Sequence, residues 1–142
     1  MQPLIVLDTS VLIAGLRSRN GPNNALLREV AKGSLILLCT PPLFLEYEDV
    51  LKRPEQVHVH QLAKTQIDQF LAELASIIHP VDVHFQWRPQ VRDPQDEMVL
   101  EAAINGYAEA LVTNNLKHFV GVGERFNIPV LSPIQMLKKV RK

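Results

Sequence analysis

Cysteine is almost absent from this chain of 142 residues, and Cys39 is the single example. One cysteine rules out a disulfide within the chain, and so scarce a thiol suits a reducing compartment. Cys39 ends the apolar run at residues 35–39, and a thiol in such a run is typical of core packing. The sequence therefore predicts a buried cysteine in a cytoplasmic protein.

Net charge is also absent, because 15 basic residues balance 15 acidic residues. No global field draws the protein to nucleic acid or to a membrane, so any nucleic-acid contact has to use local basic patches. The basic run at residues 138–142 is one such patch. Its position equally suits a solvated helix end that the helix dipole stabilises.

Long apolar runs, internal repeats and low-complexity tracts are missing as well. No apolar stretch approaches about 18 residues, which excludes a membrane-spanning helix. The N-terminal apolar run has no basic residues before it and is interrupted by Asp8, so we expect no signal peptide. A chain of 142 residues without a linker-like segment predicts a single domain over residues 1–142.

The chain does contain short apolar runs that alternate with amphipathic segments, which is typical of an α/β fold with a parallel sheet. The predicted strands are residues 4–8, 35–39, 110–113 and 130–131, with a weaker one near 78–83. The predicted helices are residues 11–16, 23–32, 40–52, 65–78, 93–106 and 133–140. Residues 53–60 and 84–92 carry no clear pattern. The second of these stretches holds Phe85 and Trp87, aromatic residues that either pack on the body or stack on bases.

The first predicted strand ends in a carboxylate, Asp8, which Thr9 and Ser10 follow. The carboxyl ends of strands are where open parallel sheets bind ligands. Aspartate is also a good N-cap for a following helix. However, the two hydroxyl residues offer neutral caps, and a buried anion without a cation is unfavourable. The sequence leaves both roles open for Asp8.

Acidic residues also lie on the predicted helix at residues 40–52. At 100° per residue, Tyr47 lies at the centre of its apolar stripe, and Glu46 and Glu48 flank the stripe on opposite sides. Asp49 points away from the stripe. Periodicity does not choose between Glu46 and Glu48, and an ordinary solvated glutamate is the alternative for each.

Asp96 shares a helical line with Val99, Ala103 and Tyr107, so it begins the face that must pack on the sheet. Asp93, three residues earlier, is predicted to be the N-cap of this helix, and Asp96 can equally complete a capping box. The inward position of Asp96 makes it the stronger metal candidate of the two.

The strand at residues 110–113 is followed by Asn114 and Asn115. Asparagine is common in turns and can cap the short segment that follows. Its side-chain oxygen also binds hard cations but brings no charge. Carboxylates that converge at one edge of a sheet repel one another unless a divalent cation lies between them. Metal-assisted phosphate chemistry is therefore the leading hypothesis.

Four motifs carry a resemblance to a known family: DTSVL at residues 8–12, LEY at 45–47, DPQD at 93–96 and LVTNN at 111–115. In this order and spacing they resemble the PIN domain family, and most closely the VapC-like toxins of bacterial toxin–antitoxin systems. The resemblance covers nearly the whole chain. It implies a three-layer α/β/α sandwich with a central parallel β-sheet.

The resemblance implies that Asp8, Glu46 and Asp96 are catalytic residues that bind Mg²⁺ or Mn²⁺. The usual fourth acidic position of the family falls on Asn115, a departure that removes one negative charge and leaves a weak ligand there. The residues expected to orient or supplement these carboxylates are Ser10, Thr113 and Asp93.

Many PIN domains cut single-stranded RNA, so the resemblance implies a Mg²⁺- or Mn²⁺-dependent endoribonuclease. It also implies a cognate antitoxin protein as a partner and a homodimer. Basic side chains border the predicted site, where they meet either RNA phosphates or solvent: Arg17, Arg19 and Lys117.

Two alternatives stand beside the nuclease. Asn115 motivates a non-catalytic PIN-like module that binds RNA or protein. Phosphoryl transfer of the haloacid-dehalogenase or receiver type also places an aspartate after the first strand. The haloacid-dehalogenase type expects a second aspartate where this chain has Ser10. The receiver type expects a lysine after a late strand, and Lys117 is badly placed for that role.

Overall fold

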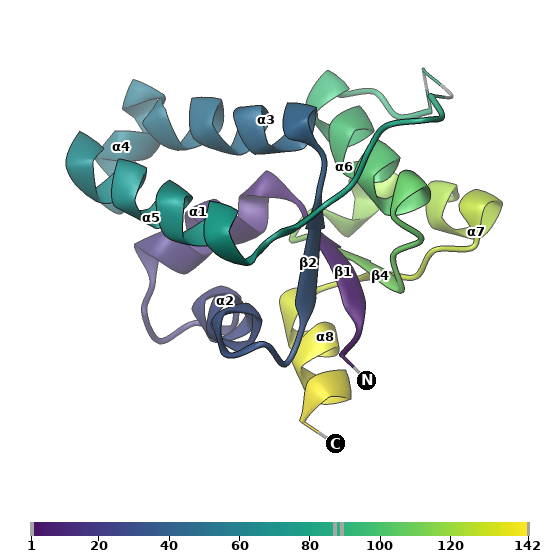
Figure 1. Ribbon diagram of the computed structural model, residues 1–142, viewed down its shortest axis with the longest axis horizontal. Coiled ribbons are helices and arrows are strands. Elements are labelled where there is room, and N and C mark those ends of the chain that lie inside the picture. The colour runs from purple at the N-terminus through teal and green to yellow at the C-terminus, as the bar shows by residue number, and fades with distance from the viewer. Residues whose placement is uncertain (1, 87, 89, 142) are drawn as a thin grey trace.

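The protein has one parallel sheet with helices on both of its faces (Figure 1). The computed structural model describes residues 2–86, 88 and 90–141. The strands are β1 (Leu4–Leu7), β2 (Ile36–Cys39), β3 (His79–Pro80), β4 (Ala110–Val112) and β5 (Val130–Leu131). The helices are α1 (Thr9–Arg17), α2 (Pro22–Lys32), α3 (Pro41–Lys52), α4 (Pro54–His60), α5 (Lys64–Ile77), α6 (Pro94–Asn105), α7 (Val122–Phe126) and α8 (Pro133–Val140), with a 3₁₀ helix η1 (Leu116–Phe119).

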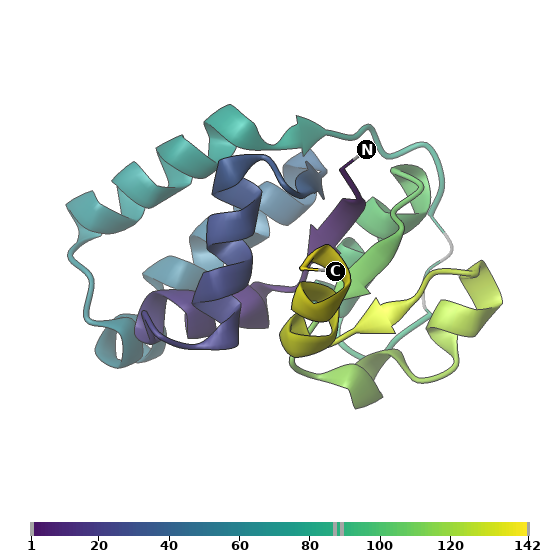
Figure 2. The same ribbon diagram turned by 90° about the horizontal axis from the view of Figure 1, so that it is seen from below.

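The strand order β3-β2-β1-β4-β5 places β1 in the middle, with every neighbouring pair parallel. The chain leaves β1 toward β2 and β3 and later returns to pair β4 with the other side of β1. Helix α6 packs on one face of the sheet, and α1, α2 and α8 lie on the other (Figure 2). This arrangement confirms the predicted α/β/α sandwich. It also makes the gap between the carboxyl ends of β1 and β4 the point where ligands bind in such sheets.

The core explains why these strands are continuously apolar. Ile5, Val6 and Leu7 have no exposed surface, and neither do Leu111 and Val112 beside them. Strands that are covered on both faces need apolar side chains at every position, not at alternate ones. Asp8 and Thr113, predicted as the last residues of these strands, lie just beyond the ladder, where polar groups can serve a site.

Two short helices escaped prediction. The stretch at residues 53–60, which showed no clear pattern, contains helix α4 from Pro54 to His60, and residues 122–126 form helix α7. A helix of five to seven residues is too short to show the 3.6-residue period. The end of α4 is fixed by His60, which is buried and has its Nε2 atom 2.9 Å from the Leu51 carbonyl oxygen.

The predicted face of α6 is correct for Val99 and Ala103, which are buried, but wrong for Tyr107. The helix ends at Asn105, and Tyr107 takes a left-handed φ of 55° with 82% of its surface exposed. A Cβ atom on Gly106 would lie 2.9 Å from both the Ala102 carbonyl oxygen and Leu38 Cδ1. The turn therefore needs glycine, and it rotates Tyr107 away from the core.

Cys39 lies in the core as predicted, and burial raises the pKa of its thiol to about 12. Among the described residues, no helix is both long and apolar enough to span a membrane.

Tyr47 ties helix α3 to the end of the central strand. Its ring is fully buried, and its hydroxyl donates a hydrogen bond to the Leu7 carbonyl oxygen at 2.5 Å. Burial raises the pKa of the Tyr47 phenol well above its usual value, so the group stays protonated and remains a donor.

We expect Tyr47→Phe to lower the free energy of unfolding by about 1–2 kcal/mol, because it removes a buried hydrogen bond and leaves the carbonyl without this donor. Urea denaturation measures the change. Tyr107→Phe is the matched control, since that side chain is 82% exposed and should leave stability unchanged. Equal effects of the two substitutions would contradict the anchoring role of Tyr47.

Candidate active site

Asp8 is held at the carboxyl end of β1 by hydroxyl donors. Its side chain is buried, and its Oδ2 atom accepts hydrogen bonds from Thr113 Oγ1 at 2.7 Å and from Ser10 Oγ at 2.9 Å. Among the described residues, its Oδ1 atom accepts one side-chain hydrogen bond, a long one from Thr9 Oγ1 at 3.4 Å. Asp8 occupies the N-cap position of α1, yet its side chain makes no capping bond. One oxygen is thus fixed by the protein, and the other can accept a ligand.

The loop after β4 is fastened to the same network. Thr113 has no exposed surface, and its Oγ1 atom also accepts a hydrogen bond from the Asn115 backbone N–H at 2.9 Å. Asn115 itself is exposed and makes no side-chain capping bond to η1. The structure therefore brings Asn115 to the site through its backbone, and no described contact joins its side chain to the acids.

Asp96 meets Asp8 from the other face of the sheet. It lies in the first turn of α6 with 6% of its surface exposed, and its Oδ2 atom is 3.1 Å from His118 Nδ1. Burial, together with the nearby carboxylates of Asp8 and Asp93, raises the pKa of Asp96 to about 6, against the opposing effect of His118. The two buried carboxylates therefore lie within electrostatic reach of one another.

Asp93 has the capping role predicted for it. Its side chain accepts a hydrogen bond from the Gln95 backbone N–H at 2.9 Å, which caps α6. Its negative charge raises the pKa of both Asp96 and Glu46. Asp93 is thus the acidic residue that links Glu46 electrostatically to the Asp8–Asp96 pair.

The structure distinguishes the two glutamates that periodicity left equivalent. Glu48 forms an ion pair with Lys52 at 3.0 Å. Glu46 has a buried Oε1 atom that accepts no hydrogen bond from the described residues, with Arg53 Nη2 3.6 Å away. Burial raises the pKa of Glu46, whereas the Arg53 guanidinium lowers it. A buried, unsatisfied carboxylate oxygen calls for a partner, which favours Glu46 as the site residue.

Two cavities adjoin the acid pair, one through Asp96 and the other through Ser10, which donates a hydrogen bond to Asp8. One, of about 800 Å³, is lined by Asp93 and Asp96 together with Lys117, His118 and Arg92. The other, of about 430 Å³, is lined by residues that include Ser10 and Arg17.

Of the three predicted phosphate-binding cations, Arg17 and Lys117 therefore border the site. Arg19 lines neither cavity, and its carbonyl oxygen accepts a hydrogen bond from Arg28. Arg92 is a further exposed cation beside Asp96 that sequence reasoning missed.

Sequence reasoning also missed a row of polar side chains on one side of α6. The row follows Asp93 at four-residue spacing and consists of Glu97, Glu101 and Asn105, called the polar ladder below. Glu97 accepts hydrogen bonds from the backbone N–H groups of residues 90 and 91, and Glu101 pairs with Arg88 at 2.5 Å. Asn105 Oδ1 accepts from the N–H groups of residues 84 and 85. The spacing 93, 97, 101 and 105 was a visible signal for this ladder. It holds part of the irregular segment that walls the larger cavity.

Phe85, one of the two aromatic residues in this segment, is 54% exposed. Trp87, the other, lies outside the described residues.

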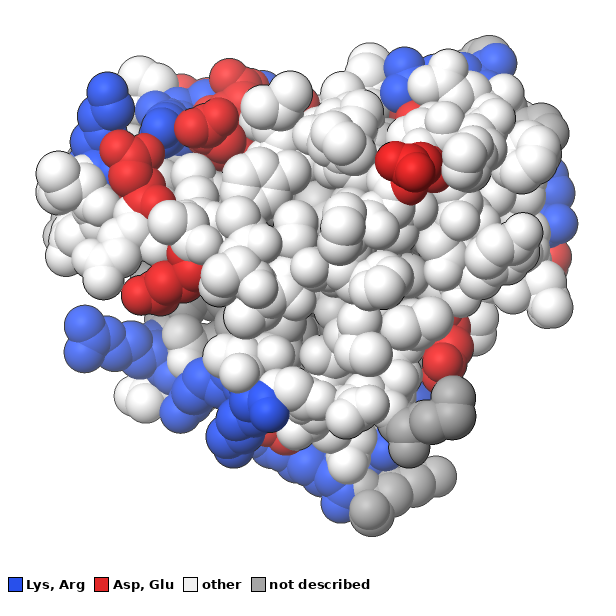
Figure 3. All heavy atoms as spheres, in the orientation of Figure 1, with Lys and Arg blue, Asp and Glu red and all other residues white. Residues whose placement is uncertain are grey.

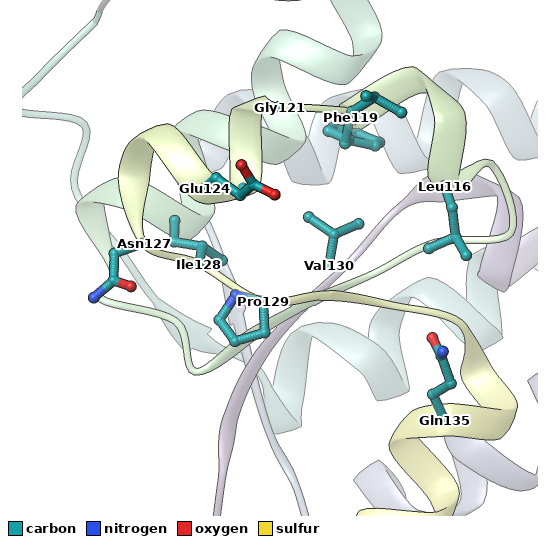
Figure 4. A pocket seen from close by; sticks show the side chains of 11 residues that line it. Leu116, Phe119, Gly121, Glu124, Asn127, Ile128, Pro129, Val130 and Gln135 are labelled. Carbon is teal, nitrogen blue, oxygen red and sulfur yellow. The ribbon is translucent and has the colours of Figure 1, made fainter.

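A third cavity, of about 500 Å³, lies between η1, α7 and β5 (Figure 4). Its lining includes apolar side chains, with Leu116, Phe119 and Val130 among them, and Glu124 is the one acid among its described residues. A single carboxylate without a neighbouring acid or cation in the lining offers no means of polarising a phosphate. The acid pair at β1 and α6 therefore remains the candidate site.

The oxygen atoms of the site are of the kind that a hard cation binds, but they do not surround a single point as a complete set of ligands. Among the described residues, no group of three or more histidine, cysteine, aspartate or glutamate side chains is arranged to hold a metal ion. Magnesium commonly binds through one or two carboxylates and fills its other positions with water and substrate phosphate. The open Asp8 oxygen, the buried Asp96 and the unsatisfied Glu46 oxygen match that mode.

The comparison with protein families decides the assignment. The profile of the PIN domain family matches residues 4–117, a span that includes every acidic residue of the candidate site. The chain belongs to the PIN domain family. No curated protein matches the chain by sequence.

Among solved structures, this PIN domain is similar to a chain in the crystal structure of VapBC2 from Rickettsia felis bound to a DNA fragment from their promoter. The two share 17% sequence identity with a TM-score of 0.59, over 91% of this chain and 98% of that chain. This likeness confirms the fold.

We expect Asp96 of the metal-free PIN domain to titrate near pH 6 and Asp8→Asn to lower its pKa, because the substitution removes a nearby negative charge while burial is retained. NMR of the side-chain carboxyl carbon as a function of pH measures both values. Asp82→Asn, an exposed acid that lines a cavity with Leu4 at the opposite end of β1, is the control. An Asp96 pKa that is the same in all three proteins would show that the two carboxylates do not interact.

Proposed function

We propose that this PIN domain is a Mg²⁺- or Mn²⁺-dependent endoribonuclease that hydrolyses single-stranded RNA. We further propose that it is the toxin of a toxin–antitoxin pair, held inactive by a cognate antitoxin protein and acting as a cytoplasmic homodimer. The observation that carries the proposal is the meeting of the Asp8 and Asp96 carboxylates, both buried, at the ligand-binding edge of the sheet. Two buried anions without a cation between them oppose folding, so their presence supports a site built for a cation.

The residues of the chain have separate tasks in this proposal. Asp8, fixed through Oδ2 by Ser10 and Thr113, would present Oδ1 to the cation, and Asp96 would supply the second carboxylate of the site from α6. When bound, the cation acidifies a water and offsets negative charge on the phosphoryl oxygens. Glu46 lies at the edge of the site, where its unsatisfied Oε1 atom would accept a hydrogen bond from that water and orient it.

His118 keeps Asp96 in place through the contact between its Nδ1 and Asp96 Oδ2. A hydrogen bond from a neighbour fixes the direction in which a liganding carboxylate points. Because Asn115 brings no charge to the site, the hold on a cation rests on carboxylates that are positioned in this way.

Local cations support RNA as the substrate. The protein is uncharged overall, and the face in Figure 3 has no continuous basic surface, because lysine and arginine gather at its periphery. Arg17 on one side of the acids and Lys117 with Arg92 on the other can meet successive phosphates of one strand. The structurally similar chain comes from VapBC2 bound to a DNA fragment from their promoter, and this likeness supports our proposal of an antitoxin partner for this chain.

The second candidate is a non-catalytic PIN module that binds RNA or protein. It is favoured by the exposed side chain of Asn115 and by the lack of a closed metal cage among the described residues. The two candidates differ in whether RNA is cut when metal is supplied.

We expect the protein to cut a labelled single-stranded RNA in the presence of Mn²⁺, with no cutting in excess EDTA. Asp8→Asn and Asp96→Asn should each slow cutting by about 100-fold or more, because each removes a charge that holds the cation. Gel electrophoresis of the products measures the rates.

Asp82→Asn is the matched control for this assay and should cut like the parent protein. Cutting that survives in both site variants would point to a contaminating nuclease. Metal-independent RNA binding without cutting would favour the non-catalytic module.

We expect Asn115→Asp to tighten Mn²⁺ binding by roughly tenfold, because it restores one negative charge near the acids. Isothermal titration calorimetry measures the affinity. Asn20→Asp adds the same charge in an exposed segment that does not line either of the cavities beside the acids, and it should leave the affinity unchanged. Equal affinities for the parent and Asn115→Asp would place this side chain beyond reach of the ion.

A further inference from the structure

The smaller cavity beside the acid pair differs in chemistry from the larger one. The larger cavity mixes cations with acids, whereas no described residue in the lining of the smaller one carries a carboxylate. It is lined by Ser10, Ile13, Ala14, Arg17, Asn23, Gln56 and Asn114. We infer that this amide-lined groove is a base-binding subsite, which holds the nucleotide next to the scissile phosphate and selects its base. The inference rests on the proposed action on RNA.

The groove is joined directly to Asp8 through shared hydrogen bonds. Ser10 Oγ donates to Asp8 Oδ2 and accepts a hydrogen bond from the Asn114 backbone N–H at 3.2 Å. Ser10 therefore belongs both to the acid network and to the wall of the groove. A strand whose phosphate lies at Asp8 has its neighbouring nucleotide at this groove.

The amides of the groove are oriented so that they can read a base. Asn114 Nδ2 donates to Asn23 Oδ1 at 2.7 Å, which leaves Asn114 Oδ1 as an acceptor and Asn23 Nδ2 as a donor. Gln56, which α4 places in the groove, has no hydrogen-bond partner for its side chain among the described residues. Asparagine and glutamine form paired hydrogen bonds with base edges, and the bases of single strands expose those edges.

The rest of the lining suits the other parts of a nucleotide. Ile13 and Ala14 are partly buried and offer apolar contact for a base, and the exposed guanidinium of Arg17 suits a phosphate. A volume of about 430 Å³ falls within the range of roughly 300–1,000 Å³ for small-ligand pockets. The groove binds a nucleobase better than a basic peptide segment, because the lysine or arginine side chains of such a peptide would need carboxylate partners and the described lining offers amides instead.

The test is to sequence the ends produced when the protein with Mn²⁺ cuts a pool of single-stranded RNA with randomised positions. The parent protein should prefer one base beside the cut. Gln56→Ala and the near-isosteric Gln56→Glu should each weaken that preference by about tenfold while cutting continues at other bases. Arg17→Ala should slow cutting at all sequences alike, because a phosphate contact carries no base information.

Gln69→Ala, which removes an exposed amide on α5, is the control and should leave both rate and preference unchanged. Thermal melting confirms that each variant is folded. An unchanged base preference in both Gln56 variants overturns the subsite and leaves the groove to a protein segment.

A parallel experiment separates this inference from the proposed nuclease. The same RNA pool is bound to the protein in EDTA, and the retained RNA is sequenced. A base enrichment that Gln56→Ala removes supports the subsite even if no cutting occurs. Retained RNA without any base enrichment, from a protein that does cut, overturns the subsite alone.

Discussion

The site depends on the two hydroxyl hydrogen bonds that Ser10 and Thr113 donate to one oxygen of Asp8. Thr113 comes from the end of β4 and Ser10 from the start of α1, so the carboxylate joins two elements at the edge of the sheet. Hydrogen bonds of this kind fix the direction in which a carboxylate points. They hold the Asp8 side chain in place and leave its Oδ1 atom open to a ligand.

The fold brings the acids together by means of contacts that have nothing to do with metal. Tyr47, one residue after Glu46, is anchored to the Leu7 carbonyl oxygen, which is one residue before Asp8. The same turn of α3 that buries Tyr47 in the core therefore sets the position of Glu46 relative to the end of β1. On α6, the buried Val99 and Ala103 fix the helix on the sheet, and Asp96 occupies the end of that face. Repulsion among the carboxylates is thus outweighed by apolar burial.

The sequence predicted the strands that are buried along their whole length. It did not predict short helices or contacts that depend on the orientation of a single side chain. Apolar runs identified β1 and β4, and the polar residues that end those runs identified Asp8 and Thr113. Periodicity could not separate Glu46 from Glu48, because both flank one stripe and only the neighbouring Lys52 and Arg53 distinguish them. Helix α4 has too few residues to show a period, so Gln56 could not be placed at all. The contact between Asp96 and His118 depends on how η1 turns after β4, which no motif specifies.

The departure at residue 115 has a further consequence for how this PIN domain meets a substrate. With asparagine there, the described acids of the candidate site follow β1 or lie on α3 and α6, and the loop after β4 contributes neutral groups instead. In that loop, the Asn114 backbone N–H donates to Ser10, and the Asn114 side chain donates to Asn23. A neutral loop repels an RNA strand less than an acidic one would. In the proposed function, the same exchange that weakens the hold on a cation therefore favours close approach of RNA on the side of Ser10, where the amide-lined groove begins.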